Sequence, residues 1–129
     1  MILFCYFQVK PLQQVAFDFA WKDALEVLNE EVHRVEADNH SEGLLIQEIS
    51  KMINEASEII CFFEVVENEK LGSLAKVFES LRKSSSRQLL MVKGENEHFE
   101  KVLPLLKQNT LKCESEIQLK KTLSEFIKA

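Results

Sequence analysis

The chain alternates short, continuous apolar runs with longer stretches in which apolar residues recur every three or four positions. Continuous runs rich in β-branched and aromatic residues are typical of strands that are covered on both faces. Three such runs are Ile2 to Phe7, Ile59 to Val66 and Gln88 to Val92. A more polar run, Thr110 to Glu114, alternates in the manner of an edge strand.

Helical spacing fills most of the chain between these strands. We predict helices over Lys22 to Ala37, Asn39 to Ala56, Lys70 to Lys83, Asn96 to about Lys107 and Ser115 to about Ile127. Pro104 should distort the fourth of these helices, because it lacks a backbone N–H.

Two helix starts carry a capping signal. Asn39 with Glu42, and Ser115 with Gln118, have the spacing of capping boxes, in which each side chain satisfies a free N–H at the helix start.

The stretch from Gln13 to Trp21 fits two structures. Val15, Phe17, Phe19 and Trp21 alternate with small or polar residues, which favours a strand. Val9 to Leu12 would then close an antiparallel hairpin with the first strand, with Pro11 at a position that needs no ladder hydrogen bond. The competing prediction is a helix with Pro11 at its first position.

The order of elements predicts a single α/β domain over residues 1–129. Because helices lie between most of the strands, we expect one mostly parallel sheet of four or five strands with flanking helices. The length and the 46% hydrophobic and 29% charged content suit one folded domain.

Charge, cysteine content and hydropathy exclude several classes of function. The net charge is −5 and no basic cluster is present, so we expect no nucleic-acid binding. No apolar run approaches the roughly 20 residues that span a bilayer, and the apolar start lacks the basic region of a signal peptide. The three cysteines, Cys5, Cys61 and Cys113, suit buried reduced thiols, and we expect a cytoplasmic protein.

The loops that follow the strands should carry the functional residues, since ligands of parallel sheets bind at the carboxyl ends of the strands. One such loop precedes a helix and could bind an anion at the helix start through Lys93, Gly94, Asn96 and His98. Glu95 and Glu97 oppose an anion, and a solvated turn with Asn96 as a cap is the alternative. We find no metal-ligand spacing, cofactor motif or catalytic set, and we expect no metal, no cofactor and no catalytic residue.

The element order resembles the STAS domain of bacterial anti-sigma factor antagonists. Ile59 to Val66 is similar to the family's third strand, and Glu67 to Gly72 takes the place of its Asp-Ser-Ser-Gly loop. The pair Leu71-Gly72 is similar to the Leu-Gly that follows that motif, and the segments Leu89 to Val92, Phe99 to Leu106 and Ser115 to Gln118 match later elements in spacing. Neither serine of the motif is present, and Glu69 takes the place of the phosphorylatable serine.

The resemblance implies a STAS-like regulatory module that binds a protein partner, such as a regulatory kinase or an anti-sigma factor. Its partner-binding residues would be Glu67, Asn68, Glu69, Lys70 and Gly72, with Glu69 as a permanent negative charge. We favour this non-enzymatic role. The alternative is a flavodoxin-like domain that binds a small ligand or nucleotide, which could be an enzyme. A homodimer built on an edge strand is a third option, and exposed aromatics among Phe17, Phe19 and Trp21 would indicate a partner.

Overall fold

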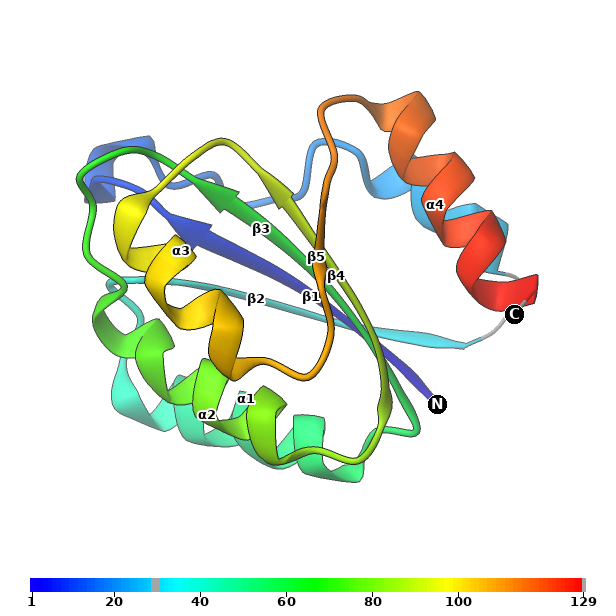
Figure 1. Ribbon diagram of the computed structural model, residues 1–129, viewed down its shortest axis with the longest axis horizontal. Helices are drawn as coiled ribbons and strands as arrows, with labels where there is room; N and C mark the ends of the chain where they lie inside the picture. Colours follow the sequence, from blue (N-terminus) through cyan, green and yellow to red (C-terminus); the bar gives the residue numbers. More distant parts are fainter. Residues whose placement is uncertain (29–30, 129) are drawn as a thin grey trace.

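The computed structural model describes residues 1–28 and 31–128, which form one five-stranded parallel sheet in the order β2-β1-β3-β4-β5 (Figure 1). The strands are β1 (Ile2–Val9), β2 (Val32–Asp38), β3 (Glu58–Val65), β4 (Arg87–Lys93) and β5 (Thr110–Lys112). Four α-helices follow four of the strands: α1 (Gly43–Glu55), α2 (Ala75–Lys83), α3 (Glu97–Val102) and α4 (Glu116–Lys128). Short 3-10 segments are η1 (Leu12–Gln14), η2 (Lys22–Leu28), η3 (Gly72–Leu74) and η4 (Leu103–Leu105).

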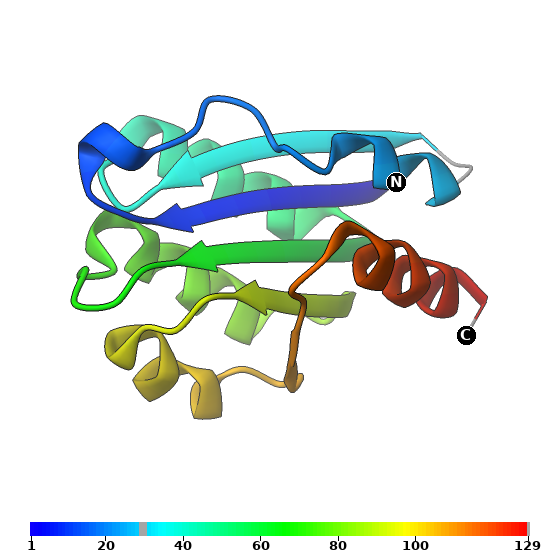
Figure 2. The same ribbon diagram turned by 90° about the horizontal axis from the view of Figure 1, so that it is seen from above.

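The connections cover the two faces of the sheet differently. The chain steps from β1 to β2 in one direction and from β2 through β3 and β4 to β5 in the other. Connections between parallel strands of one sheet are right-handed. A connection that steps one way along the sheet therefore crosses one face, and a connection that steps the other way crosses the opposite face. Helices α1, α2 and α3 therefore lie on one face, the three-helix face, while η2 and α4 lie together on the other, the α4 face (Figures 1 and 2).

Alternation along β1 divides the apolar residues between two cores. Leu3, Cys5 and Phe7 point to the three-helix face, whereas Phe4 and Tyr6 point to the α4 face. All of these side chains are buried. This burial on both faces explains why β1 reads as a continuous apolar run.

The α/β class, the mostly parallel sheet and its flanking helices are confirmed, and the three apolar runs are β1, β3 and β4. The helix interrupted by Pro104 ends at Val102 and continues only as η4. The polar run is the edge strand β5, shorter than expected. Ser115 Oγ accepts from Gln118 N–H at 3.2 Å, as the capping signal predicts. The Gln118 side chain, however, accepts from Glu114 N–H rather than from the cap itself.

The predicted hairpin is wrong, because all strand pairs among the described residues are parallel and Val15 to Trp21 form no strand. This segment instead runs irregularly across the α4 face. Phe19 is buried against the rings of Tyr6 and Phe62, while Phe17 is 93% exposed. The alternation of aromatics thus reflects a loop that buries only some of its rings, without strand pairing.

The helix predicted over Lys22 to Ala37 is also wrong. Its first part is η2, residues 29 and 30 lie outside the described residues, and its last part is β2, which pairs with β1. The capping box at Asn39 is wrong as well, since α1 begins at Gly43 and Glu42 makes no side-chain capping bond. The side chain of Asn39 bonds instead to the backbone of Lys10 and Lys70. The strand order is that of flavodoxin-like doubly wound sheets, the alternative fold.

Candidate functional site

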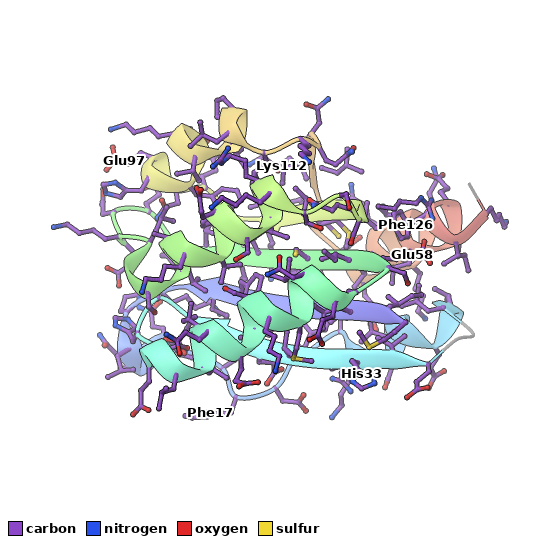
Figure 3. The ribbon with its side chains drawn as sticks, turned by 90° about the horizontal axis from the view of Figure 1, so that it is seen from below. Phe17, His33, Glu58, Glu97, Lys112 and Phe126 are labelled. Carbon is purple, nitrogen blue, oxygen red and sulfur yellow. The ribbon has the colours of Figure 1, made fainter. Side chains whose placement is uncertain are left out.

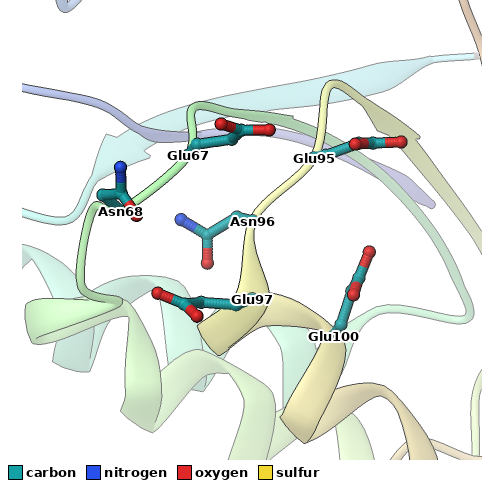
Figure 4. A pocket seen from close by; sticks show the side chains of 6 residues that line it. All are labelled: Glu67, Asn68, Glu95, Asn96, Glu97 and Glu100. Carbon is teal, nitrogen blue, oxygen red and sulfur yellow. The ribbon is translucent and has the colours of Figure 1, made fainter.

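The carboxyl ends of β3 and β4 border a hollow (Figure 4). Its volume is about 290 Å³, and we call it the acidic hollow. It is lined by Glu67, Asn68, Glu95, Asn96, Glu97 and Glu100. The first two residues belong to the loop predicted to bind a partner, and Asn96 belongs to the loop predicted to bind an anion. The fold therefore joins parts of both predicted sites in one place.

Asn96 ties the two loops together. Its side-chain Nδ2 donates to the carbonyls of Val66 and Glu69, both at 2.7 Å, and its Oδ1 accepts from Phe99 N–H at 2.8 Å. The last bond caps α3, as the sequence suggested, but Asn96 is only 1% exposed and does not lie in a solvated turn. A buried amide with all these bonds holds the floor of the hollow in one conformation.

Gly94 has a packing role beside the hollow. Its φ is +95°, and an added Cβ would lie 2.1 Å from the carbonyl oxygen of Val65. Only glycine lets the chain leave β4 so close to β3.

The two basic residues of the predicted anion site do not line the hollow. Lys93 Nζ lies 4.9 Å from the centre of the Trp21 ring, on the α4 face. His98 Nε2 lies 3.9 Å from Glu97, and neither Lys93 nor His98 lines the acidic hollow. Its lining consequently contains four carboxylates and no cation.

Asn39 anchors the other end of the loop after β3. Its Oδ1 accepts from Lys10 N–H at 3.1 Å and its Nδ2 donates to the Lys70 carbonyl at 3.0 Å. Its own carbonyl accepts from Ser73 N–H at 3.3 Å. Gly72, with φ +55°, allows this approach, because a Cβ there would lie 2.1 Å from that carbonyl oxygen. The segment from Glu67 to Gly72 is thus fixed at both ends, by Asn96 and by Asn39.

Asn39 also spans the point between β1 and β3 where the direction of the strand order reverses. Flavodoxin-like sheets bind their ligands in the crevice at this point. Here the bonds from Asn39 join the end of β1 to the loop after β3 across it. The nearby Lys10 side chain is itself engaged, by an ion pair with Glu64 and a bond to Gln8 Oε1 at 3.0 Å. The polar groups at this point are therefore bonded to one another within the chain.

The thiols are unsuited to nucleophilic chemistry. Cys5 and Cys61 are register partners on adjacent strands and are fully buried. Burial, and then the neighbouring Cys61, raises the pKa of the Cys5 thiol. Burial likewise raises the pKa of Cys113. A thiol with a raised pKa and no exposure stays protonated and inert.

Two kinds of feature are absent from the described residues. Within residues 1–28 and 31–128, no group of His, Cys, Asp and Glu side chains has the arrangement needed to hold a metal ion. In the same residues, no helix has both the length and the apolar character needed to cross a membrane.

The fold and the site together define an α/β protein with a flavodoxin-like strand order and an acidic hollow at the carboxyl ends of its strands. No known protein-family model, curated protein or solved structure matches the chain.

Proposed function

We propose that this protein is a non-enzymatic interaction module whose acidic hollow binds a basic segment of a protein partner. The observation that carries the proposal is the set of four carboxylates, Glu67, Glu95, Glu97 and Glu100, around one open hollow. Among the described residues, Glu67, Glu95 and Glu100 take part in no ion pair. Their combined field attracts lysine and arginine side chains and speeds association with a basic partner.

The rigidity of the two loops favours the same proposal. A binding surface that is already ordered loses little conformational entropy when a partner docks. The bonds from Asn96 and Asn39 supply this order for the loop after β3. The backbone that carries Glu67 is therefore already in place before the partner arrives.

The resemblance to anti-sigma factor antagonists gives the proposal a finer form. In that form the partner is a regulatory kinase or an anti-sigma factor, and it contacts Glu67 to Gly72. Glu69 would supply a permanent charge where the family carries a phosphorylatable serine. Its half-buried position, with its carbonyl bonded to Asn96, suits a fixed contact better than a switched one.

The same residues weigh against a nucleotide or another phosphate ligand. Four carboxylates repel a phosphate at the acidic hollow, and Asn39 bridges the alternative position between β1 and β3. We therefore expect ATP, GTP and FMN to leave the melting temperature unchanged, because only a ligand that binds the folded state raises it.

The direct test is a titration of the ¹⁵N-labelled protein with a short lysine-rich peptide, followed by NMR. Shift changes should concentrate at residues 67–69 and 95–100 and weaken as salt is added. The double variant Glu95→Gln with Glu100→Gln should weaken binding by about tenfold. The control variant, Glu48→Gln with Glu125→Gln, changes the net charge equally at exposed positions on α1 and α4.

The finer form is tested by capture of partners from a lysate with the same variants and with Glu69→Ser. A partner that depends on Glu95 and Glu100 but not on the control pair supports the acidic hollow. Dependence on Glu69 in addition supports the loop contact. Equal peptide binding by the wild type and both double variants would contradict the proposal.

A further inference from the structure

The outer side of β2 is an open edge of the sheet. The two edge strands differ, since β5 has three residues whereas β2 has seven. Short length is one of the ways in which proteins protect an edge strand from pairing with another chain. The longer β2 contains no proline, and its charged residues Arg34 and Glu36 have opposite signs, so they repel a second copy only in some registers.

Hydrogen bonding to β1 determines which backbone groups of β2 are free. Asn39 N–H donates to Gln8 O at 3.0 Å, and Gln8 is the register partner of Asp38. In a parallel ladder, this bond means that the backbone N–H and C=O groups of the odd-numbered residues of β2 point toward β1. The N–H and C=O groups of Arg34 and Glu36 therefore point outward. Asp38 N–H, which also points outward, is already bonded to Ser41 Oγ at 2.9 Å.

We propose that β2 pairs with β2 of a second copy of this chain, antiparallel about a two-fold axis at Val35, to form a homodimer with one continuous sheet. Arg34 of each copy would then lie opposite Glu36 of the other. Both are residues whose backbone groups point outward, so each pair can exchange two backbone hydrogen bonds. The side chains of each pair lie on the same face, and the two-fold axis repeats the contact.

The charges of β2 select this register over its neighbours. Backbone pairing also permits a two-fold axis at Arg34 or at Glu36. The first would place two arginines opposite each other, and the second two glutamates. Like charges directly opposite are destabilising, whereas unlike charges stabilise a cross-strand pair. An axis at Glu36 would also place Arg34 opposite Asp38, but of the three central registers only the one at Val35 joins unlike charges without setting like charges directly opposite each other.

Among the described residues, neither charge has a strong partner. Arg34 forms only a long ion pair, with Asp18 at 3.7 Å, and that carboxylate also pairs with Lys22 at 2.7 Å. Glu36 forms no ion pair within the described residues. Burial, and then the charge of Asp18, raises its pKa. A second copy would bring an arginine to this partly buried carboxylate.

Exposed apolar side chains lie beside the same edge. Phe17 is 93% exposed and Leu45 is 43% exposed, and both border a hollow of about 170 Å³ together with Glu36 and Ala37. Figure 3 shows Phe17 at the margin of the molecule next to β2. A strand placed along β2 would pass this hollow and cover apolar surface that is open to water in the single chain.

Sedimentation velocity of the wild type and of charge variants tests the proposal. The wild type should dimerise, and Arg34→Glu or Glu36→Arg alone should each raise the dissociation constant at least about tenfold. An equal mixture of the two variants should form a heterodimer, since every opposed pair then joins unlike charges. Lys121→Glu, an exposed charge reversal on α4, should leave the dimer unchanged.

A cysteine at the axis gives a second readout that does not depend on charge. Val35→Cys should form a disulfide-linked dimer on mild oxidation, because residues at this type of position lie about 4.5 Å apart in Cα distance. His33→Cys, two residues from the axis, should not. A monomeric wild type, a dimer that survives both single reversals, or a mixture that fails to associate would overturn the proposal. Circular dichroism confirms that each variant is folded before it is compared.

Discussion

The two faces of the sheet are built on the same strands but are covered in different ways. On the three-helix face, α1 to α3 present regular apolar stripes to the sheet. On the α4 face, one helix, η2 and the irregular segment 15–21 cover an apolar core, and the same side of the sheet carries the polar cluster of Gln8, Lys10 and Glu64. The comparison shows that a strand buried on both faces does not require two helical layers. Aromatic rings carried by a loop can take the place of one of them.

The largest expected difference between the faces is in the stability lost when a buried ring is removed, and two neighbouring residues of β3 allow the comparison. Phe63 packs on the rings of Phe7, Phe78 and Phe99 on the three-helix face. Phe62 packs on Tyr6, Phe19 and Trp21 on the α4 face. Both are fully buried. We expect Phe63→Ala to lower the free energy of unfolding by about 4 kcal/mol and Phe62→Ala by about 3, because a loop relaxes into a cavity more readily than packed helices do.

Denaturant unfolding of the two variants measures this difference. A larger loss for Phe62→Ala would mean that segment 15–21 is as rigid as the helices. The two faces would then be mechanically equivalent despite their different coverings.

The next largest change in stability is expected in the polar cluster of the α4 face. Lys10 and Glu64 form an ion pair in which Lys10 is only 10% exposed. Lys10→Met or Glu64→Gln should each cost about 2 kcal/mol, because each leaves a partly buried group without its partner. The double variant should cost clearly less than the sum.

The matched control for this pair lies at the opposite end of β3. Glu58 pairs with Arg87 at 2.7 Å in a more exposed position. Glu58→Gln should cost only a few tenths of a kcal/mol, roughly the value of a surface pair. Equal losses at Glu58 and Glu64, measured by the same unfolding curves, would show that burial does not distinguish the two pairs.

The same contrast explains which parts of the fold the sequence predicts. The helices of the three-helix face follow from stripes such as Ile46, Ile49 and Ile53, whose spacing suits only a helix. In β2, Val32 and Val35 fit a helical stripe as well as a strand, so local periodicity predicts a continuation of the preceding helix there. Its place in the sheet depends on pairing with β1, which local periodicity does not record.

The candidate site shows the same division. The rule for parallel sheets correctly directs attention to the loops after β3 and β4, and Asn96 is recognisable as a cap. The role of Asn39 was not predictable, because its partners Lys10 and Lys70 are 29 and 31 residues away in the sequence. Nor does local sequence reveal that Lys93 turns to Trp21 on the opposite face.

The ionisation of Tyr6, the only tyrosine of the chain, reports on the electrostatics of the α4 face. Burial, and then the charge of Glu64, raises the pKa of Tyr6 above its ordinary value. Because folding favours the protonated form, its contribution to stability is complete below the unfolded pKa of about 10 and declines as the pH rises above it. We expect the free energy of unfolding to fall by about 1 kcal/mol between roughly pH 10 and pH 11.

Ultraviolet absorbance of the tyrosinate measures this ionisation directly. The folded protein should ionise at a higher pH than the protein in denaturant, and Glu64→Gln should reduce the difference. In Tyr6→Phe the corresponding pH dependence of stability should disappear. Ionisation of folded Tyr6 at the ordinary pKa would show that the α4 face is open to water at this point.

The smallest expected difference is in local opening: segment 15–21 on the α4 face should open more easily than helix α1 on the three-helix face, with no change in global stability. Ala16 N–H donates to the side-chain Oε1 of Gln8 at 2.9 Å, whereas the amides of α1 belong to a continuous helix. In native-state hydrogen exchange, we expect the Ala16 amide to open at a lower free energy than those of Ile49 and Ile53, which should exchange only through global unfolding. Phe17→Ser should leave the global free energy within about 0.5 kcal/mol of the wild type, since this ring is exposed. If Ala16 and the α1 amides open together, segment 15–21 belongs to the same cooperative unit as the helices, and the difference between the faces is one of shape alone.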